Sequence, residues 1–361
     1  MRKFPMSRNI NVALASFGVS GRVFHAPFID AHPNLILAKI VERYCESSRE
    51  MYPNADFVDD LQDVLLDETI DLVVVPTPDE HQFDIAERAL LADKHVIIQS
   101  PFASSIREAR QLIDLAIRRN RILTVYPNRR WDGDFLTIKN IVENGVLGDL
   151  HVYEAHLDRH VLNGKNGAVH GAKTQGKSTL IDLGSHLIDQ AIELFGMPLS
   201  VQADLDAQEG NSGLGGIELI LDYGRLNVIL RARMAGPIAR FIVRGTAASF
   251  IKFGYPHNES DMCVLSPLSE SWAKEPKEYW GKLNMLDEGL HLKGSVETLA
   301  GSHMTYYESI YDAIALQYEL GVKPEEALNT IRVIEAAIES NQQRRTILMH
   351  TTPQTVRSVP A

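Results

Sequence analysis

The sequence predicts two domains: an α/β domain with a parallel sheet, then an α+β domain with a large, mostly antiparallel, open sheet. The chain has 361 residues, which is more than one hydrophobic core usually organises. Residues 10–126 alternate short β-branched runs with amphipathic helical stretches, a rhythm typical of a parallel sheet covered on both faces. After about residue 127, runs of strands are bracketed by helices. We therefore expect domains at 1–126 and 127–361.

Six apolar runs are the expected strands of the first domain: 10–15, 35–41, 55–58, 71–75, 95–98 and 122–126, the third being weaker than the others. Helices are expected between them, because apolar residues recur at helical spacing over 85–90 and 106–117. Ser105 followed by Glu108 forms a capping box ahead of the second of these helices.

The second domain begins with a helix near 135–143 and a strand near 150–157, followed by a glycine-rich stretch at 163–176. A helix is expected at 182–195, then four strand-like runs over 199–252, two of them joined by a hairpin turn at 222–225. Two helices, near 303–320 and 324–344, close the chain.

Composition argues against several classes of partner. The net charge of −11 opposes binding to nucleic acid or anionic lipid, and the cationic residues are scattered. Cys45 and Cys263 form no C-x-x-C pair, so we expect neither a disulfide framework nor a cysteine zinc site. No segment has the length of a membrane span or the pattern of a signal peptide. We expect a cytoplasmic protein without nucleic-acid or membrane partners.

A glycine-containing turn follows the first strand, where dinucleotide-binding folds carry G-x-G-x-x-G. Gly18 and Gly21 match the second and third glycines, while Ser16 replaces the first. Gly18 would allow the backbone to approach a pyrophosphate, and Gly21 would allow the helix and strand to pack closely. A loose glycine pattern alone is often an ordinary turn, but this position predicts a Rossmann-type domain that binds NAD or NADP.

An acidic residue ends the second strand, about twenty positions beyond Gly21. Glu42 at that place would accept hydrogen bonds from an adenosine ribose, which favours NAD. Arg43 follows and could stack on adenine or meet a 2′-phosphate. The alternative is a solvated pair at a strand end. We favour NAD over NADP.

Several further segments together resemble the glucose-fructose oxidoreductase, inositol dehydrogenase and MocA (Gfo/Idh/MocA) family. They are residues 18–27, 73–78 with His81, 128–132, 181–189 with 194–196, and 240–254. The resemblance covers most of the chain, and motifs in the right order are more specific than any one of them. It implies hydride transfer between NAD(P) and a sugar, inositol or related small polyol or ketone. Its open sheet implies a homodimer or homotetramer.

The resemblance also implies site residues. Those expected at the cofactor are Phe17, Gly18, Val19, Ser20, Gly21, Glu42, Arg43, Pro76, Thr77, Pro78, His81, Gln99, Ser100, Asn128, Arg129 and Trp131. Asp182 and His186 lie four apart, so on a helix they share a face. Such a pair alone is more often a polar helix surface, but the resemblance makes His186 the acid–base group and Asp182 its partner.

The chain departs from the family where an acidic residue, a lysine and a proline usually end the fifth strand. It has Gln99, Ser100 and Pro101, so the family's catalytic lysine is replaced by a serine that carries no positive charge. Three hypotheses remain open. His186 acts alone, Lys173 or Lys177 supplies the missing cation, or the protein is a catalytically impaired NAD(P)- or sugar-binding regulator or scaffold.

Two other readings are weak. Residues 171–178 fit the G-x-x-x-x-G-K-[ST] phosphate loop, but a buried strand should precede that loop, whereas 163–170 is polar and glycine-rich.

The histidines show no H-E-x-x-H spacing, and His156 and His160 fit a strand end better than a metal site. We expect no metal.

Overall fold

The protein, represented by a computed structural model, is described over residues 8–42, 46–76, 79–157, 179–205, 216–232, 239–254, 267, 274–287 and 289–349. The chain divides into two compact units. Unit 1 lies within Met1–Trp131, His257–Ala273 and Ser302–Ile331, and unit 2 lies within Asp132–Pro256, Lys274–Gly301 and Arg332–Ala361.

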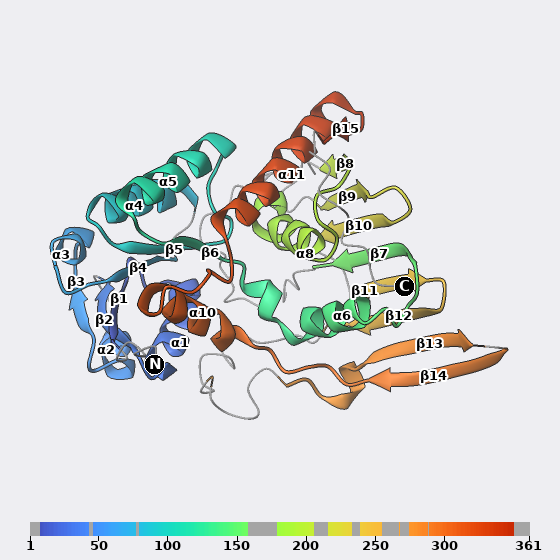
Figure 1. The fold of residues 1–361 in the computed structure, drawn as a ribbon, viewed down its shortest axis with the longest axis horizontal. Coiled ribbons are helices and arrows are strands. Elements are labelled where there is room, and N and C mark those ends of the chain that lie inside the picture. Colours follow the sequence, from blue (N-terminus) through green and yellow to red (C-terminus); the bar gives the residue numbers. More distant parts are fainter. Residues whose placement is uncertain are drawn as a thin grey trace, which may run out of the picture. The chain divides into compact units, whose positions relative to one another are not determined.

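Unit 1 is built on a parallel sheet of six strands in the order β3-β2-β1-β4-β5-β6 (Figure 1). The strands are β1 (Ile10–Leu14), β2 (Leu35–Val41), β3 (Asp56–Val58), β4 (Leu72–Val75), β5 (His95–Gln99) and β6 (Leu123–Tyr126). All six predicted strands are confirmed. The central ones are buried on both faces, which is why their sequences are continuous apolar runs.

Helices cover both faces of this sheet. They are the π-helix η1 (Gly21–His25), α1 (Ala26–Ala31), α2 (Glu46–Met51), α3 (Leu61–Leu65), α4 (Asp79–Leu91), α5 (Ile106–Arg119), the 3₁₀ turn η2 (Asn128–Trp131) and α10 (His303–Ala315). Side chains of α1 and α10 pack on one face and those of α4 and α5 on the other. The predicted cap of α5 is confirmed, since Ser105 Oγ accepts from the Glu108 amide at 3.3 Å.

Unit 2 contains a nine-stranded mixed sheet in the order β14-β13-β12-β11-β7-β10-β9-β8-β15. The strands are β7 (Leu150–His156), β8 (Ser200–Leu205), β9 (Ile217–Asp222), β10 (Asn227–Ala232), β11 (Ala239–Gly245), β12 (Ala248–Phe253), β13 (Gly281–Asp287), β14 (Leu290–Val296) and β15 (Ile347–Leu348). Every neighbouring pair is antiparallel except β7 with β10. The predicted, mostly antiparallel sheet is confirmed.

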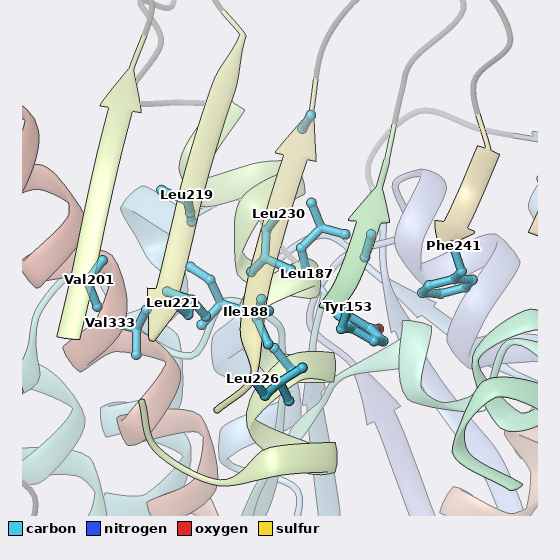
Figure 2. Close-up of a cluster of buried hydrophobic side chains, with 14 of the residues drawn as sticks. Tyr153, Leu187, Ile188, Val201, Leu219, Leu221, Leu226, Leu230, Phe241 and Val333 are labelled. Atoms are coloured by element: carbon cyan, nitrogen blue, oxygen red, sulfur yellow. The ribbon is translucent and has the colours of Figure 1, made fainter. Parts of the chain in front are cut away.

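One face of this sheet carries the core of unit 2. The helical elements are α6 (Gly133–Glu143), the π-helix η3 (Leu180–Gly184), α8 (Ser185–Phe195), the 3₁₀ turn η4 (Lys277–Tyr279) and α11 (Pro324–Gln343), within which the division between units falls after Ile331. Figure 2 shows Leu187 and Ile188 of α8 packed against Leu219, Leu221 and Leu230 of the sheet. These alternate strand positions are buried, as a period of two predicts.

Two details of unit 2 differ from the sequence-based expectation. Residues 199–252 contribute five strands rather than four, because only Thr246 and Ala247 separate β11 from β12 and the two read as a single run. The β13–β14 hairpin was not predicted, although apolar residues alternate with polar ones in both strands, as at Leu290 and Leu292 of β14. The predicted turn at 222–225 is confirmed as the link between β9 and β10.

Candidate functional site

The carboxyl ends of the unit 1 strands gather most of the predicted cofactor residues along one edge of the sheet. The strand order 3-2-1-4-5-6 is that of the dinucleotide-binding folds, and the order reverses between β1 and β4. Ligands of open α/β sheets bind outside the carboxyl ends at such a reversal. The loops after β1 and β4 therefore form the candidate site.

The turn after β1 uses its two glycines in different ways. A Cβ on Gly21 would lie 2.9 Å from the Ser16 carbonyl oxygen and 3.6 Å from Pro76 Cγ, so only glycine fits without movement of the backbone. A Cβ on Gly18 would meet no protein atom within 4 Å. Gly21 allows the helix and the strand to pack closely, and Gly18 leaves open backbone that a pyrophosphate can approach.

Glu42 follows β2 at the same edge of the sheet. Its backbone amide donates to the Val58 carbonyl at 3.0 Å. Its Oε2 is buried and, among the residues that the structure describes, has no hydrogen-bond partner. A buried carboxylate oxygen without a donor is costly unless a ligand supplies one. Ribose hydroxyls are such donors, so these residues fit the adenosine half of a nicotinamide dinucleotide.

Gln99 is the last residue of β5, and its side chain connects the glycine turn to the buried His25. Its Oε1 accepts from Ser20 Oγ at 3.0 Å and lies 2.8 Å from His25 Nε2. His25 Nδ1 lies 2.7 Å from the hydroxyl of Tyr307 on α10. Complete burial lowers the pKa of His25 to about 4, against the opposing effect of its hydrogen bond to Gln99. His25 is therefore a neutral imidazole near pH 7.

The remaining predicted cofactor residues occupy varied environments in unit 1. Phe17 is buried against Tyr52 at a ring distance of 5.8 Å, whereas Val19 is 54% exposed. The Ser100 amide donates to the Tyr126 carbonyl at 3.4 Å, so Ser100 stands at the end of β5 beside β6.

The motif after β6 forms the 3₁₀ turn η2 in unit 1. Asn128 is buried, Arg129 and Trp131 are half-buried, and His81 on α4 is exposed. In the described part of the chain, Asn128 Oδ1 has no partner. The predicted residues Arg43, Thr77 and Pro78 lie outside the described residues, as do Lys173, Lys177, Cys45, Cys263, His160 and the phosphate-loop-like segment at 171–178.

The predicted acid–base pair belongs to unit 2. Asp182 lies in the π-helix η3 and is exposed. His186 is the second residue of α8 and is half-buried, and its Nδ1 is shielded from solvent. The segment expected as one helix is thus a π-turn followed by an α-helix. π-Turns are rare and often mark functional sites. Gly184 between the two residues is confined, since a Cβ there would lie 2.7 Å from Ile217 Cδ1.

A buried polar cluster near α8 was not found by sequence reasoning. A bulge in β11 re-aims Arg240, whose guanidinium donates to Gln190 Oε1 at 3.0 Å and to the His156 carbonyl at 2.8 Å. Its Nε lies 3.3 Å from Asp134 Oδ2. Gln190 lies one helical turn beyond His186, so this cluster anchors the helix that carries the predicted base. No local pattern marks such a site, because its members come from four elements.

A second buried pair lies on β12. Lys252 is fully buried and donates to Glu275 Oε2 and to the carbonyls of Phe253 and Tyr279. Burial raises the pKa of Glu275, against the opposing effect of Lys252. All hydrogens of the ammonium are used within the fold, so this pair is structural.

The part of the chain that the structure describes holds neither a candidate metal site nor a membrane-spanning helix. Within those ranges, no three His, Cys, Asp or Glu side chains are grouped so as to hold a metal ion. In the same residues, no helix is long and apolar enough to cross a bilayer.

Comparison with known proteins finds the same two-part architecture. The family described as "Oxidoreductase family, NAD-binding Rossmann fold" matches residues 10–127, and "Oxidoreductase family, C-terminal alpha/beta domain" matches residues 139–349. Scyllo-inositol 2-dehydrogenase (NADP(+)) IolW of Bacillus subtilis is 35% identical over 94% of this chain and 96% of that protein. Uncharacterized oxidoreductase YdgJ of Escherichia coli is 34% identical over 95% of this chain and 100% of that protein. The crystal structure of an oxidoreductase from Bacillus cereus superposes with a TM-score of 0.85 at 28% identity, over 96% of this chain and 100% of that one.

Proposed function

This chain belongs to the Gfo/Idh/MocA family of NAD(P)-dependent oxidoreductases, and we propose that it transfers hydride between the nicotinamide and a sugar, inositol or related small polyol or ketone. The observation that carries the proposal is the carboxyl edge of the unit 1 sheet. There, the open backbone at Gly18 suits the pyrophosphate of the cofactor, and the buried, unpartnered carboxylate oxygen of Glu42 suits its adenosine ribose. The inositol dehydrogenase relative supports the substrate class.

The preferred cofactor is NAD in this proposal. Glu42 supports it, because a carboxylate accepts from two ribose hydroxyls and repels a 2′-phosphate. The relative from Bacillus subtilis is named for NADP(+), which makes the direct comparison informative. Glu42→Ala should weaken NADH binding about tenfold, about 1.4 kcal/mol, and weaken NADPH binding less. Equal losses for both dinucleotides in a fluorescence titration would refute the role of Glu42.

His186 is proposed as the acid–base group and Asp182 as its partner. The bound nicotinamide supplies the hydride acceptor or donor at ring carbon C4. Oxidation of an alcohol also requires removal of the hydroxyl proton, and an imidazole does this near neutral pH. The π-turn and the anchored helix α8 support a fixed position for His186.

Removal of the imidazole tests this assignment. His186→Asn should lower turnover roughly 10²- to 10⁴-fold, the usual contribution of a positioned acid–base group. NADH affinity should stay within about twofold, because His186 and the glycine turn belong to different units. Turnover that survives the substitution would remove His186 from the mechanism.

A second candidate function follows from Gln99 and Ser100. Without the family's lysine at position 100, the protein would bind NAD(P) or a sugar as a regulator or scaffold and would not turn over. A redox screen across sugars, inositols and small ketones separates the two candidates. Turnover that is lost in His186→Asn supports the dehydrogenase. Tight NADH binding with no turnover on the whole panel supports the regulator.

Self-association through the unit 2 sheet is also part of the proposal, as a homodimer or homotetramer. The β13–β14 hairpin, drawn in orange in Figure 1, ends the sheet with a free edge. Its Leu286, Leu290 and Leu292 are 67%, 65% and 52% exposed, more apolar surface than a monomeric strand edge usually carries. Leu290→Lys with Leu292→Lys should reduce the mass measured by light scattering. An unchanged mass would place the interface elsewhere.

A further inference from the structure

The 3₁₀ turn η2 carries predicted cofactor residues and depends on the rest of unit 1 for its conformation. A 3₁₀ turn of four residues makes few internal hydrogen bonds, so tertiary contacts must fix it. The Arg130 amide donates to the Pro127 carbonyl at 2.9 Å, and the Trp131 carbonyl accepts from the Ser302 amide at 2.9 Å. Both bonds hold the backbone at the end of the turn.

The Arg130 side chain ties η2 to the start of α11. It is 8% exposed, and its Nη1 donates to Glu326 Oε2 at 2.6 Å. The other carboxylate oxygen of Glu326 accepts from the Lys323 amide at 3.1 Å, and the Glu326 amide donates to the Lys323 carbonyl at 3.1 Å. These reciprocal bonds hold Glu326 in the first turn of α11, where it presents a fixed, charged acceptor to Arg130. All three residues belong to unit 1.

The turn η2 follows the half of the Rossmann sheet that is expected to bind the nicotinamide nucleotide. Such a sheet consists of two mononucleotide-binding halves, and Glu42 after β2 is the proposed ribose acceptor in the half formed by β1–β3. The half formed by β4–β6 therefore remains for the nicotinamide nucleotide. Asn128 Oδ1 in η2 is buried and, in the part of the chain that the structure describes, lacks a donor. A ligand amide is a suitable donor for such an oxygen.

We propose that Arg130 and Glu326 are positioning residues for the nicotinamide end of the dinucleotide: their ion pair fixes η2 and with it the direction of Asn128. This inference rests on the proposed function, because it assumes that a nicotinamide dinucleotide binds at the carboxyl edge of the unit 1 sheet. Arg130 acts through the turn and does not touch the cofactor, since its buried guanidinium is directed to Glu326. The ion pair should therefore affect recognition of nicotinamide and not of the adenosine diphosphate.

The test removes each end of the ion pair and measures binding by calorimetry. The ligands are NADH or NADPH, whichever the wild type prefers, and the matching molecule without nicotinamide, which is ADP-ribose or its 2′-phosphate. Arg130→Met and Glu326→Ala should each weaken dinucleotide binding about tenfold, because binding must then order the turn. Affinity for the nicotinamide-free ligand should stay within about twofold of wild type. Since either substitution frees the same turn, the double variant should lose little more than either single variant.

Thr124→Val is the matched control. Thr124 on β6 is fully buried, and its hydroxyl donates to the Val322 carbonyl at 2.8 Å. This bond joins β6 to the segment just before α11, the same two parts of unit 1, but it does not involve η2. Thr124→Val should lower the thermal unfolding temperature and leave both affinities unchanged.

The outcomes separate positioning from other roles of the ion pair. Weaker dinucleotide binding in Arg130→Met with wild-type affinity in Glu326→Ala would make Arg130 a direct ligand. Equal losses for both ligands would indicate a general disturbance of the site, and wild-type affinities in both single variants would indicate a purely structural pair. Each of these three results overturns the inference and leaves the dehydrogenase proposal intact.

Wild-type protein that binds neither NADH nor NADPH would overturn the inference and the proposed function together. If Arg130→Met does not fold, Glu326→Ala decides. The Glu326 side chain is 34% exposed, so its removal leaves Arg130 within reach of water. An unchanged ratio between the two affinities in that variant would contradict the positioning role.

Discussion

The glycine turn provides the sharpest test of the cofactor site, because its two glycines predict opposite effects on stability. Gly18 and Gly21 both lie outside the left-handed region of backbone space, so alanine can adopt either conformation. Gly18→Ala adds a methyl group to open space, and the stiffer unfolded chain should raise stability by about 0.4–1 kcal/mol. Gly21→Ala instead places the methyl 2.9 Å from the Ser16 carbonyl oxygen.

The backbone must move to relieve that contact, because a carbonyl oxygen has no rotamer to change. Overpacking of this kind costs about 1–3 kcal/mol. Gly21→Ala should therefore lose stability and NADH affinity together, as the turn that holds Gly18 is displaced. Gly18→Ala should lose affinity alone, at least about tenfold, or about 1.4 kcal/mol, since its methyl occupies the space into which the pyrophosphate is proposed to fit.

Urea unfolding and NADH fluorescence titration on the same preparations measure the two effects. Wild-type affinity in a stable Gly18→Ala variant would show that no phosphate approaches this turn. Wild-type stability in Gly21→Ala would show that the close approach to Ser16 does not constrain the turn.

Further predictions concern buried charge and pH. Lys252→Met should destabilise unit 2 by about 3–5 kcal/mol, because it leaves Glu275 charged and buried, whereas Lys252→Met with Glu275→Gln should cost less; urea unfolding of both variants checks this. Burial lowers the pKa of His25 and of His95 to about 4, so each binds a proton more readily when unfolded. Stability should therefore be complete above about pH 6.5 and fall toward pH 4, by at most about 3 kcal/mol per histidine. A His95→Asn variant that keeps the wild-type acid profile would contradict this cause. Ser105→Ala should cost about 1 kcal/mol by removing the cap of α5, and an unchanged thermal midpoint would refute that estimate.

Local patterns in the sequence were sufficient to predict the six strands of unit 1 and its helices α4, α5 and α10. Strands buried on both faces are continuous apolar runs, and the Ser105 cap and the 222–225 turn depend on residues that are close along the chain. The number of strands over 199–252 was predicted as four instead of five because only two residues separate β11 from β12. So short a turn does not visibly interrupt an apolar run. The β13–β14 hairpin was missed although its strands alternate apolar and polar residues, as at Leu290 and Leu292.

The sequence alone determined that a glycine turn follows β1 and that an acidic residue ends β2, and the position of Ser100 in place of the family's lysine stays a prediction from the resemblance. These features are each contained within a few residues. Only the tertiary structure decided that Gln99 meets Ser20 and His25, that His25 meets Tyr307 across 282 residues of chain, and that Lys252 and Arg240 are buried among polar partners. The strand order and the β11 bulge create those contacts. A local sequence pattern does not indicate which distant segments the topology brings together.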